Sequence, residues 1–103
     1  MENVVSGSQR IEKPMSSPRA SLEQSASCWR TVVHNDPVNL MTYVQWVFES
    51  YFSMGPSVAY AKMMEVHNAG RAIVSTGQRE QMERDAQEMH TYGLRATIEE
   101  AEC

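Results

Sequence analysis

Proline and glycine residues divide most of this chain into short segments, and this punctuation constrains the fold more than any other feature. Pro37 and Pro56 interrupt apolar stretches, while Gly70 and Gly93 follow stretches with helical spacing. Proline removes a backbone donor and disfavours a helical conformation in the residue before it, and glycine commonly ends a helix. The breaks therefore predict short elements in the order strand, helix, helix, strand, helix, strand.

The spacing of apolar residues assigns a type to each segment. Runs rich in β-branched residues predict strands, and apolar residues at three- and four-residue steps predict amphipathic helices. Asn39 is expected to be the N-cap of the first helix, whose apolar face comprises Leu40, Val44, Val47, Phe48 and Tyr51. The expected strands are 29–35, 72–75 and 94–99, and the expected helices are 40–52, 56–69 and 79–92. Three short strands with three helices packed on one face form an α+β fold.

Residues 1–27 differ from the rest of the chain. They are rich in serine, include Pro14 and Pro18, and show no periodic apolar pattern. A segment of this composition buries too little apolar surface to fold. We therefore expect a disordered, flexible N-terminal extension over 1–27 and one folded domain over 28–103. No stretch resembles the apolar core of about 7–15 residues in a secretory signal, or the ~20 apolar residues of a membrane span, so no membrane partner is expected.

The net charge and the cysteine spacing indicate which partners and which compartment to expect. The formal net charge is −4, and acidic residues concentrate between positions 80 and 102. Proteins that bind nucleic acid show the opposite bias, so no nucleic-acid partner is expected. Cys28 and Cys103 do not form a Cys-x-x-Cys motif. They are interpreted as incidental thiols of a reduced, cytoplasmic protein.

The sequence offers no arrangement typical of an enzyme. His34, His67 and His90 are scattered without metal-ligand spacing. Neither a nucleophile elbow nor a phosphate-binding loop is present. We therefore expect a protein without catalytic activity, metal or cofactor.

Two segments about thirty residues apart combine polar acceptors with flexible apolar side chains. The first, 34–41, is the end of a strand leading into a helix, and the second, 63–70, is the last two turns of a helix. If they meet, they form a small apolar pocket with Asn35, Asp36 and His67 at its rim. Such a pocket suits the free amine and apolar side chain of a peptide N-terminus, because an ammonium group requires hydrogen-bond acceptors. A lone histidine on a helix is more often a packing residue, so His67 alone does not decide the matter.

The same segments carry a resemblance to a known family. The motifs, in order, are Val32-Val33-His34-Asn35-Asp36, Met41 with Val44, Phe48 to Phe52, Met63-Met64-Glu65-Val66-His67, Gly70, Ala72-Ile73, and Leu94 with Thr97. In order and spacing they resemble the ClpS family, bacterial adaptors that deliver N-degron proteins to a Clp protease. The resemblance covers roughly Trp29 to Glu100 and implies an antiparallel sheet. It also implies an adaptor for proteins that begin with Leu, Phe, Tyr or Trp, delivered to a ClpA- or ClpC-type AAA+ unfoldase.

The resemblance assigns roles to individual residues. It implies that Asn35 and His67, with Asp36, bind the N-terminal amine. The implied side-chain pocket consists of Met41, Val44, Met63, Val66 and Leu94, with Met41 as a gate that rejects β-branched Ile and Val.

The resemblance also implies that the N-terminal tail and two acids act on the unfoldase. Glu80 and Glu83 match acids near the unfoldase-docking surface of the family. A stabilising negative charge at a helix N-terminus explains these two residues equally well.

One position departs from the family pattern. Many members have a second Asp where this chain has Pro37, so one acidic acceptor for the amine is missing. Asn39 either supplies a substitute acceptor or only caps the helix.

A second interpretation comes from a different class of protein. The expected fold also resembles the C-terminal domain of the ribosomal stalk protein, an interaction module without amine recognition. Such a module requires a face rich in Lys and Gly, whereas Lys62 is the single lysine after residue 27.

Overall fold

The structure, a computed structural model, describes residues 28–102. Its elements are β2 (Cys28–His34), α2 (Met41–Phe52), α3 (Pro56–Ala69), β3 (Arg71–Gly77), α4 (Arg79–Thr91) and β4 (Arg95–Ala101). This order confirms the predicted succession of strands and helices. The expected flexible extension, 1–27, lies outside the described residues. None of the described helices has the length and apolarity needed to cross a membrane.

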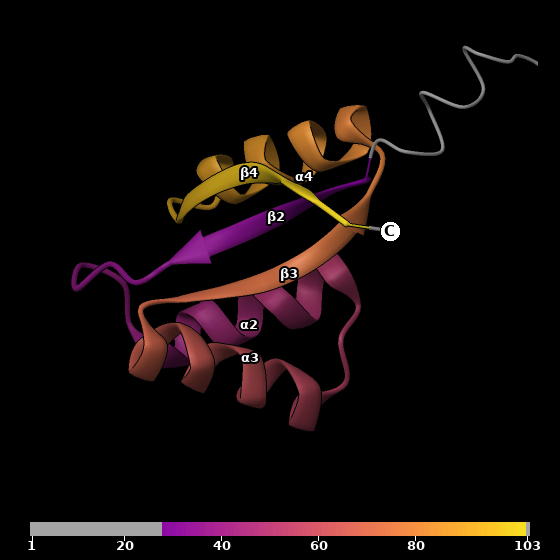
Figure 1. Cartoon of the computed structure of the whole chain (residues 1–103). Helices are drawn as coiled ribbons and strands as arrows, with labels where there is room; N and C mark the ends of the chain where they lie inside the picture. The colour runs from indigo at the N-terminus through magenta and orange to yellow at the C-terminus, as the bar shows by residue number, and fades with distance from the viewer. Residues whose placement is uncertain (1–27, 103) are drawn as a thin grey trace, which may run out of the picture. The chain divides into compact units, whose positions relative to one another are not determined.

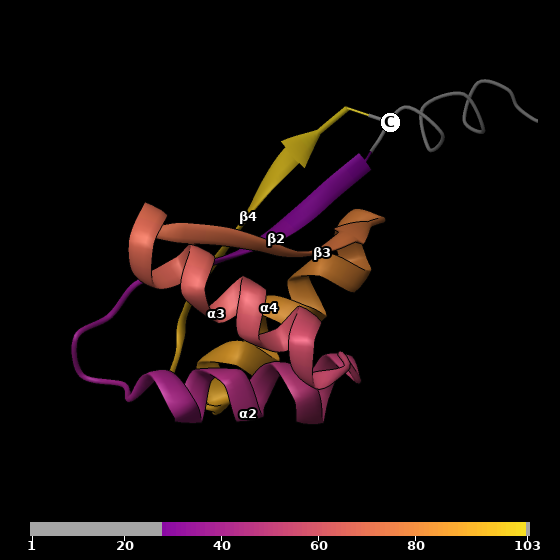
Figure 2. The same ribbon diagram turned by 90° about the horizontal axis from the view of Figure 1, so that it is seen from below.

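The strands form one three-stranded antiparallel sheet with β2 at its centre, in the order β3-β2-β4 (Figure 1). In the pairing of β2 with β3, Thr31 lies opposite Ser75 and Val32 opposite Ile73, with a bulge between Thr31 and Val32. All three helices lie on the same side of this sheet (Figure 2). The predicted α+β architecture is therefore confirmed.

The core lies between the sheet and the helices. Phe48, Val47 and Met89 are fully buried there, and the predicted inward stripe of α3 is buried as Ala59, Met63 and Val66. The expected apolar face of α2 is wrong in one residue, because Leu40 is 73% exposed. Leu40 precedes the helix with extended backbone angles, φ −71° and ψ 144°, so its side chain leaves the helical face.

The expectation that Asn39 caps the first helix is also wrong. Leu40 occupies the N-cap position, and no side chain caps the helix. The Asn39 Nδ2 group instead donates a hydrogen bond of 3.0 Å to the backbone oxygen of Gly93. Gly93 has φ 89°, a left-handed conformation that glycine adopts without strain, and it ends the turn after α4. The side chain of Asn39 thus joins the loop after β2 to the turn before β4.

A buried carboxylate joins three elements of the fold. Asp85 of α4 is 4% exposed and accepts hydrogen bonds from Tyr51 of α2 at 2.8 Å and Ser75 of β3 at 2.8 Å. Gln81 donates a further bond at 2.9 Å. Burial, reinforced by the bond to Asp85, raises the pKa of Tyr51 to about 12. A buried carboxylate is tolerated only when donors satisfy it in this way.

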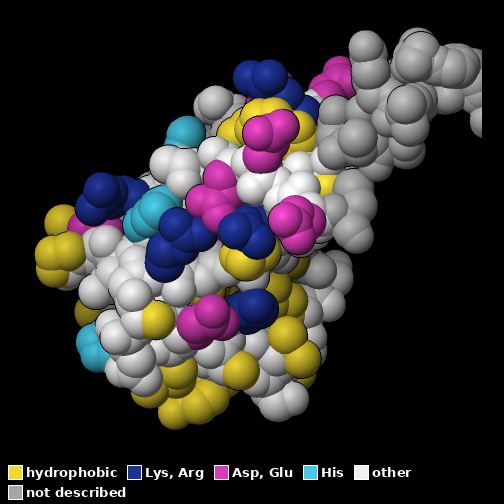
Figure 3. All heavy atoms as spheres, viewed as in Figure 1, with side chains coloured by type: hydrophobic (Ala, Val, Ile, Leu, Met, Phe, Trp, Pro, Cys, Tyr) yellow, Lys and Arg dark blue, Asp and Glu magenta, His cyan; other side chains and the backbone are white. Residues whose placement is uncertain are grey.

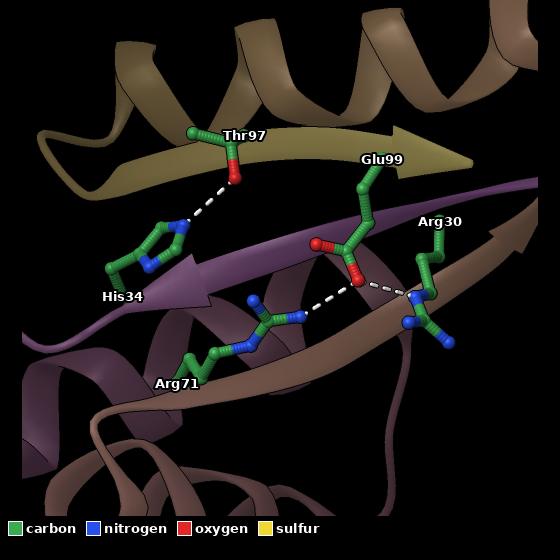
Figure 4. Close-up of polar contacts among 5 residues, drawn as sticks. All are labelled: Arg30, His34, Arg71, Thr97 and Glu99. Atoms are coloured by element: carbon green, nitrogen blue, oxygen red, sulfur yellow. Dashed lines mark hydrogen bonds and ion pairs between the residues drawn. The ribbon is translucent and has the colours of Figure 1, made fainter. Parts of the chain in front are cut away.

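The face of the sheet away from the helices carries basic and acidic side chains close together (Figure 3). Glu99 of β4 accepts hydrogen bonds from Arg30 of β2 at 2.6 Å and Arg71 of β3 at 2.8 Å (Figure 4). These bonds, with that of Arg71 the larger cause, hold the pKa of Glu99 below its usual value. One carboxylate thereby links all three strands.

The expectation for the cysteines is wrong at Cys28, because Cys28 is disulfide-bonded in the structure. The absence of a Cys-x-x-Cys motif could not exclude this bond, because that motif reports only cysteines that are close in sequence. Cys103 lies outside the described residues.

Candidate functional site

An open pocket lies beside the loop that joins β2 to α2. The predicted amine-binding residues, Asn35, Asp36 and His67, all line it. The structure brings these three together with the predicted side-chain pocket residues Met41, Val44, Met63, Val66 and Leu94. The two segments that the sequence analysis paired therefore do meet in the fold.

A backbone hydrogen bond explains why the two halves of the rim meet. The Asn35 N–H group donates to the carbonyl oxygen of Gly70 at 2.9 Å. Gly70 ends α3 with φ 88°, and its own N–H group donates to Val66 at 3.0 Å. The end of β2 is therefore fixed beside the last turn of α3, which carries His67. Both Asn35 and His67 are exposed and accessible to a ligand.

The wall of the pocket is apolar and mostly buried. Val44, Met63, Val66 and Leu94 are buried, whereas Met41, the first residue of α2, is 37% exposed. Leu94 takes its position from the end of α4, because its N–H group donates to the Met89 carbonyl at 2.9 Å across the Gly93 turn. The exposure of Met41 is consistent with a place at the pocket mouth.

Asp36 shapes the rim as well as contributing charge. One of its carboxylate oxygens, Oδ1, accepts a 3.0 Å bond from the Val38 N–H group. Its backbone oxygen accepts a second bond from the Asn39 N–H group at 3.1 Å. Asp36 therefore holds the turn that follows β2, in addition to its predicted place at the rim.

Val33 and His34, which were not predicted to belong to the site, also line the pocket, as does Asn39, the alternative acceptor considered from the sequence. His34 forms a 2.8 Å hydrogen bond with Thr97 Oγ1 on β4 (Figure 4). Asn39 lines the pocket while its Nδ2 group donates to the Gly93 carbonyl.

Glu80 and Glu83 do not belong to this pocket. They lie in the first turns of α4, where Glu83 forms an exposed ion pair of 3.0 Å with Arg79. Among residues 28–102, no group of three or more His, Cys, Asp and Glu side chains could hold a metal ion. The chemistry that the pocket itself offers is non-covalent: acceptors at one end and an apolar cavity behind them.

Comparison with known proteins gives a consistent result. The family model described as "ATP-dependent Clp protease adaptor protein ClpS" matches residues 24–97. The chain is 60% identical over 72 residues to the ATP-dependent Clp protease adapter protein ClpS of Streptomyces coelicolor, covering 70% of this chain and 75% of that protein. It is 49% identical over 81 residues to the protein of the same name from Mycobacterium marinum, covering 79% and 80% of the two chains.

A solved structure shares the fold. It is Agrobacterium tumefaciens ClpS2 bound to L-phenylalaninamide, with a TM-score of 0.71 and 24% sequence identity. The match covers 74% of this chain and 99% of the other.

Proposed function

Because this chain belongs to the ClpS family of ATP-dependent Clp protease adaptors, we propose that it binds N-degrons, specifically proteins that begin with Leu, Phe, Tyr or Trp. It then delivers them to a AAA+ unfoldase of the ClpA or ClpC type, in the cytoplasm, and catalyses no reaction itself. The observation that carries this proposal is one pocket that joins the acceptors Asn35, Asp36 and His67 to an apolar wall.

The amine supplies the first part of the recognition. An N-terminal ammonium has three N–H donors, and a donor left unsatisfied in a complex costs about 1–3 kcal/mol. The Asn35 amide oxygen, a neutral His67 imidazole nitrogen and the Asp36 carboxylate are acceptors on the same rim. The rim therefore favours a peptide end over an internal segment, which has no ammonium group.

The apolar wall supplies the second part. Burial of a Leu or Phe side chain is worth about 1.5–3 kcal/mol. That free energy alone corresponds to weak binding, so the amine contacts are needed for useful affinity. L-phenylalaninamide, which is bound to ClpS2, has the same two chemical groups, a free amine and an apolar side chain.

The ribosomal-stalk-like alternative has less support. An interaction module without amine recognition makes no use of a pocket that has polar acceptors at its mouth.

Glu80 and Glu83 lie outside the pocket, at the start of α4, where they are available for contact with the unfoldase. This second role is part of the proposal.

The test compares two Leu-initiated peptides that differ only in N-terminal acetylation, with affinity measured by fluorescence anisotropy. The acetylated peptide should bind at least about tenfold more weakly, because it loses charge-assisted hydrogen bonds. Asn35→Ala and His67→Ala should weaken binding of the free peptide, while Asn68→Ala, outside the pocket on the same helix turn, should not. Equal affinity for both peptides would rule out amine recognition.

A further inference from the structure

Two large apolar side chains project into solvent beside the pocket. Val38 is 84% exposed and Leu40 is 73% exposed, the two highest values among the exposed large hydrophobic residues of the described chain. They alternate with Asn39 and Met41, both of which line the pocket. From Val38 to Met41, residues outside the pocket therefore alternate with residues that line it. In Figure 3, hydrophobic side chains project at the left edge, where Figure 1 places this loop.

The loop holds these two side chains in place. The Val38 N–H group is bonded to Asp36 Oδ1 at 3.0 Å, and the Leu40 carbonyl accepts the first helical bond of α2, from Val44 at 3.1 Å. Between them, the Asn39 side chain is bonded to Gly93. Hydrogen bonds thus hold the main chain of this loop, and both apolar side chains are exposed on it.

A bound peptide must continue past this surface. If its first residue occupies the pocket, its second and third residues emerge at the mouth, advancing at most about 3.3–3.6 Å per residue. Val38 and Leu40 are each one residue, about 3.8 Å between Cα atoms, from the pocket-lining Asn39. Both the second residue of a bound peptide and these two apolar residues are therefore about one residue length from the pocket lining.

We propose that Val38 and Leu40 form a second subsite, which contacts the second residue of the bound peptide and favours an apolar side chain there. This inference rests on the proposed function. The occupant is the peptide because the surface is continuous with the pocket rim. The single charged residue of the loop, Asp36, has the same sign as an acidic second residue. The expected order of affinity is therefore apolar, then serine, then aspartate at position two.

The test uses free-amine peptides that begin Leu-Phe, Leu-Ser and Leu-Asp and are otherwise identical, with affinities measured by fluorescence anisotropy. The parent protein should bind Leu-Phe about fivefold more tightly than Leu-Ser, a fraction of the effect of full burial. The double variant Val38→Ser/Leu40→Ser should lose this preference and retain its affinity for Leu-Ser within about twofold. Val58→Ser is the matched control, since Val58 of α3 is 52% exposed and lies outside the pocket. It should keep the preference.

The outcomes separate the two proposals. If all free-amine peptides bind but the second residue has no influence, or if the double variant keeps the preference, the second subsite is ruled out and the proposed function stands. If no free-amine peptide binds better than its acetylated form, the proposed function fails and the second subsite fails with it. Circular dichroism of the double variant verifies its fold, which exposed loop substitutions should leave intact.

Discussion

At the scale of single residues, Met41 should set which side chains the pocket accepts. It lines the pocket, is 37% exposed and begins α2. Met41→Ala removes bulk at the mouth, so N-terminal Ile and Val should bind more readily, and the preference for Leu over Ile should fall about tenfold. Met64→Ala, a half-buried methionine of α3 outside the pocket, is the control. An unchanged Leu/Ile affinity ratio in Met41→Ala would place the selectivity elsewhere.

Tyr51 should make the stability of the fold sensitive to alkaline pH. Its pKa rises from 10.0 to about 12 on folding. Because the pKa of Tyr51 is higher in the folded state, its protonated phenol contributes to the free energy of unfolding. This contribution is fully present below pH 10 and is lost as pH rises toward 12. Tyr51→Phe should cost about 1–2 kcal/mol at pH 7, since Asp85 loses a donor. It should also flatten the decline in stability between pH 10 and 12.

Urea denaturation at a series of pH values measures both effects. Tyr60→Phe is the matched control, because Tyr60 is exposed on α3. Identical alkaline losses in the parent and in Tyr51→Phe would show that this phenol is not responsible.

Much of the pocket could be predicted from the sequence, and the omissions have a physical cause. The rim residues Asn35, Asp36 and His67 lie close in sequence to Pro37 or Gly70, and all three line the pocket in the fold. The hydrogen bonds from His34 to Thr97 and from Asn39 to Gly93 could not be predicted, because these partners are 63 and 54 positions away. The spacing of residues within a short segment cannot predict a contact between residues so far apart in the sequence.

At the scale of elements, the bond between Asn39 and Gly93 should stabilise the loop after β2. Asn39→Asp replaces the donor with a carboxylate that faces the Gly93 carbonyl, so the free energy of unfolding should fall by about 1–2 kcal/mol. Asn39→Ala, which removes the bond without adding charge, should have a smaller effect. Asn68→Asp adds the same charge on the exposed end of α3 and serves as the control. Urea denaturation that ranks the two Asp variants equally would contradict this role.

The positions of proline and glycine predicted the boundaries of the helices and strands well, because each of these residues acts on the backbone conformation at its own position. Gly70 and Gly93 do have positive φ, the conformation in which glycine commonly follows the end of a helix. The apolar pattern failed at Leu40, since periodicity alone cannot tell where a helix begins. It also missed the burial of Asp85, whose partners Tyr51 and Ser75 belong to other elements.

At the scale of the whole molecule, peptide binding and delivery should be separable. The pocket is built entirely from residues after 32, so deletion of residues 1–27 should leave peptide affinity nearly unchanged. The family resemblance implies that the tail acts on the unfoldase, so degradation of an N-degron substrate by the cognate Clp protease should slow. Full-rate degradation would show that the tail is passive. A loss of peptide affinity would show that the domain begins earlier.

The hydrogen bond from the Asn35 N–H group to the Gly70 carbonyl has a consequence for the evolution of this site. It joins main chain to main chain, so most side-chain replacements along the rim leave it intact. Mutation can therefore change which acceptors the rim offers without moving the two segments apart. Such an arrangement tolerates Pro37, where the resemblance implies an Asp in many family members. Proline at position 35 is the replacement that removes the donor, and we expect lineages to avoid it however freely the neighbouring positions drift.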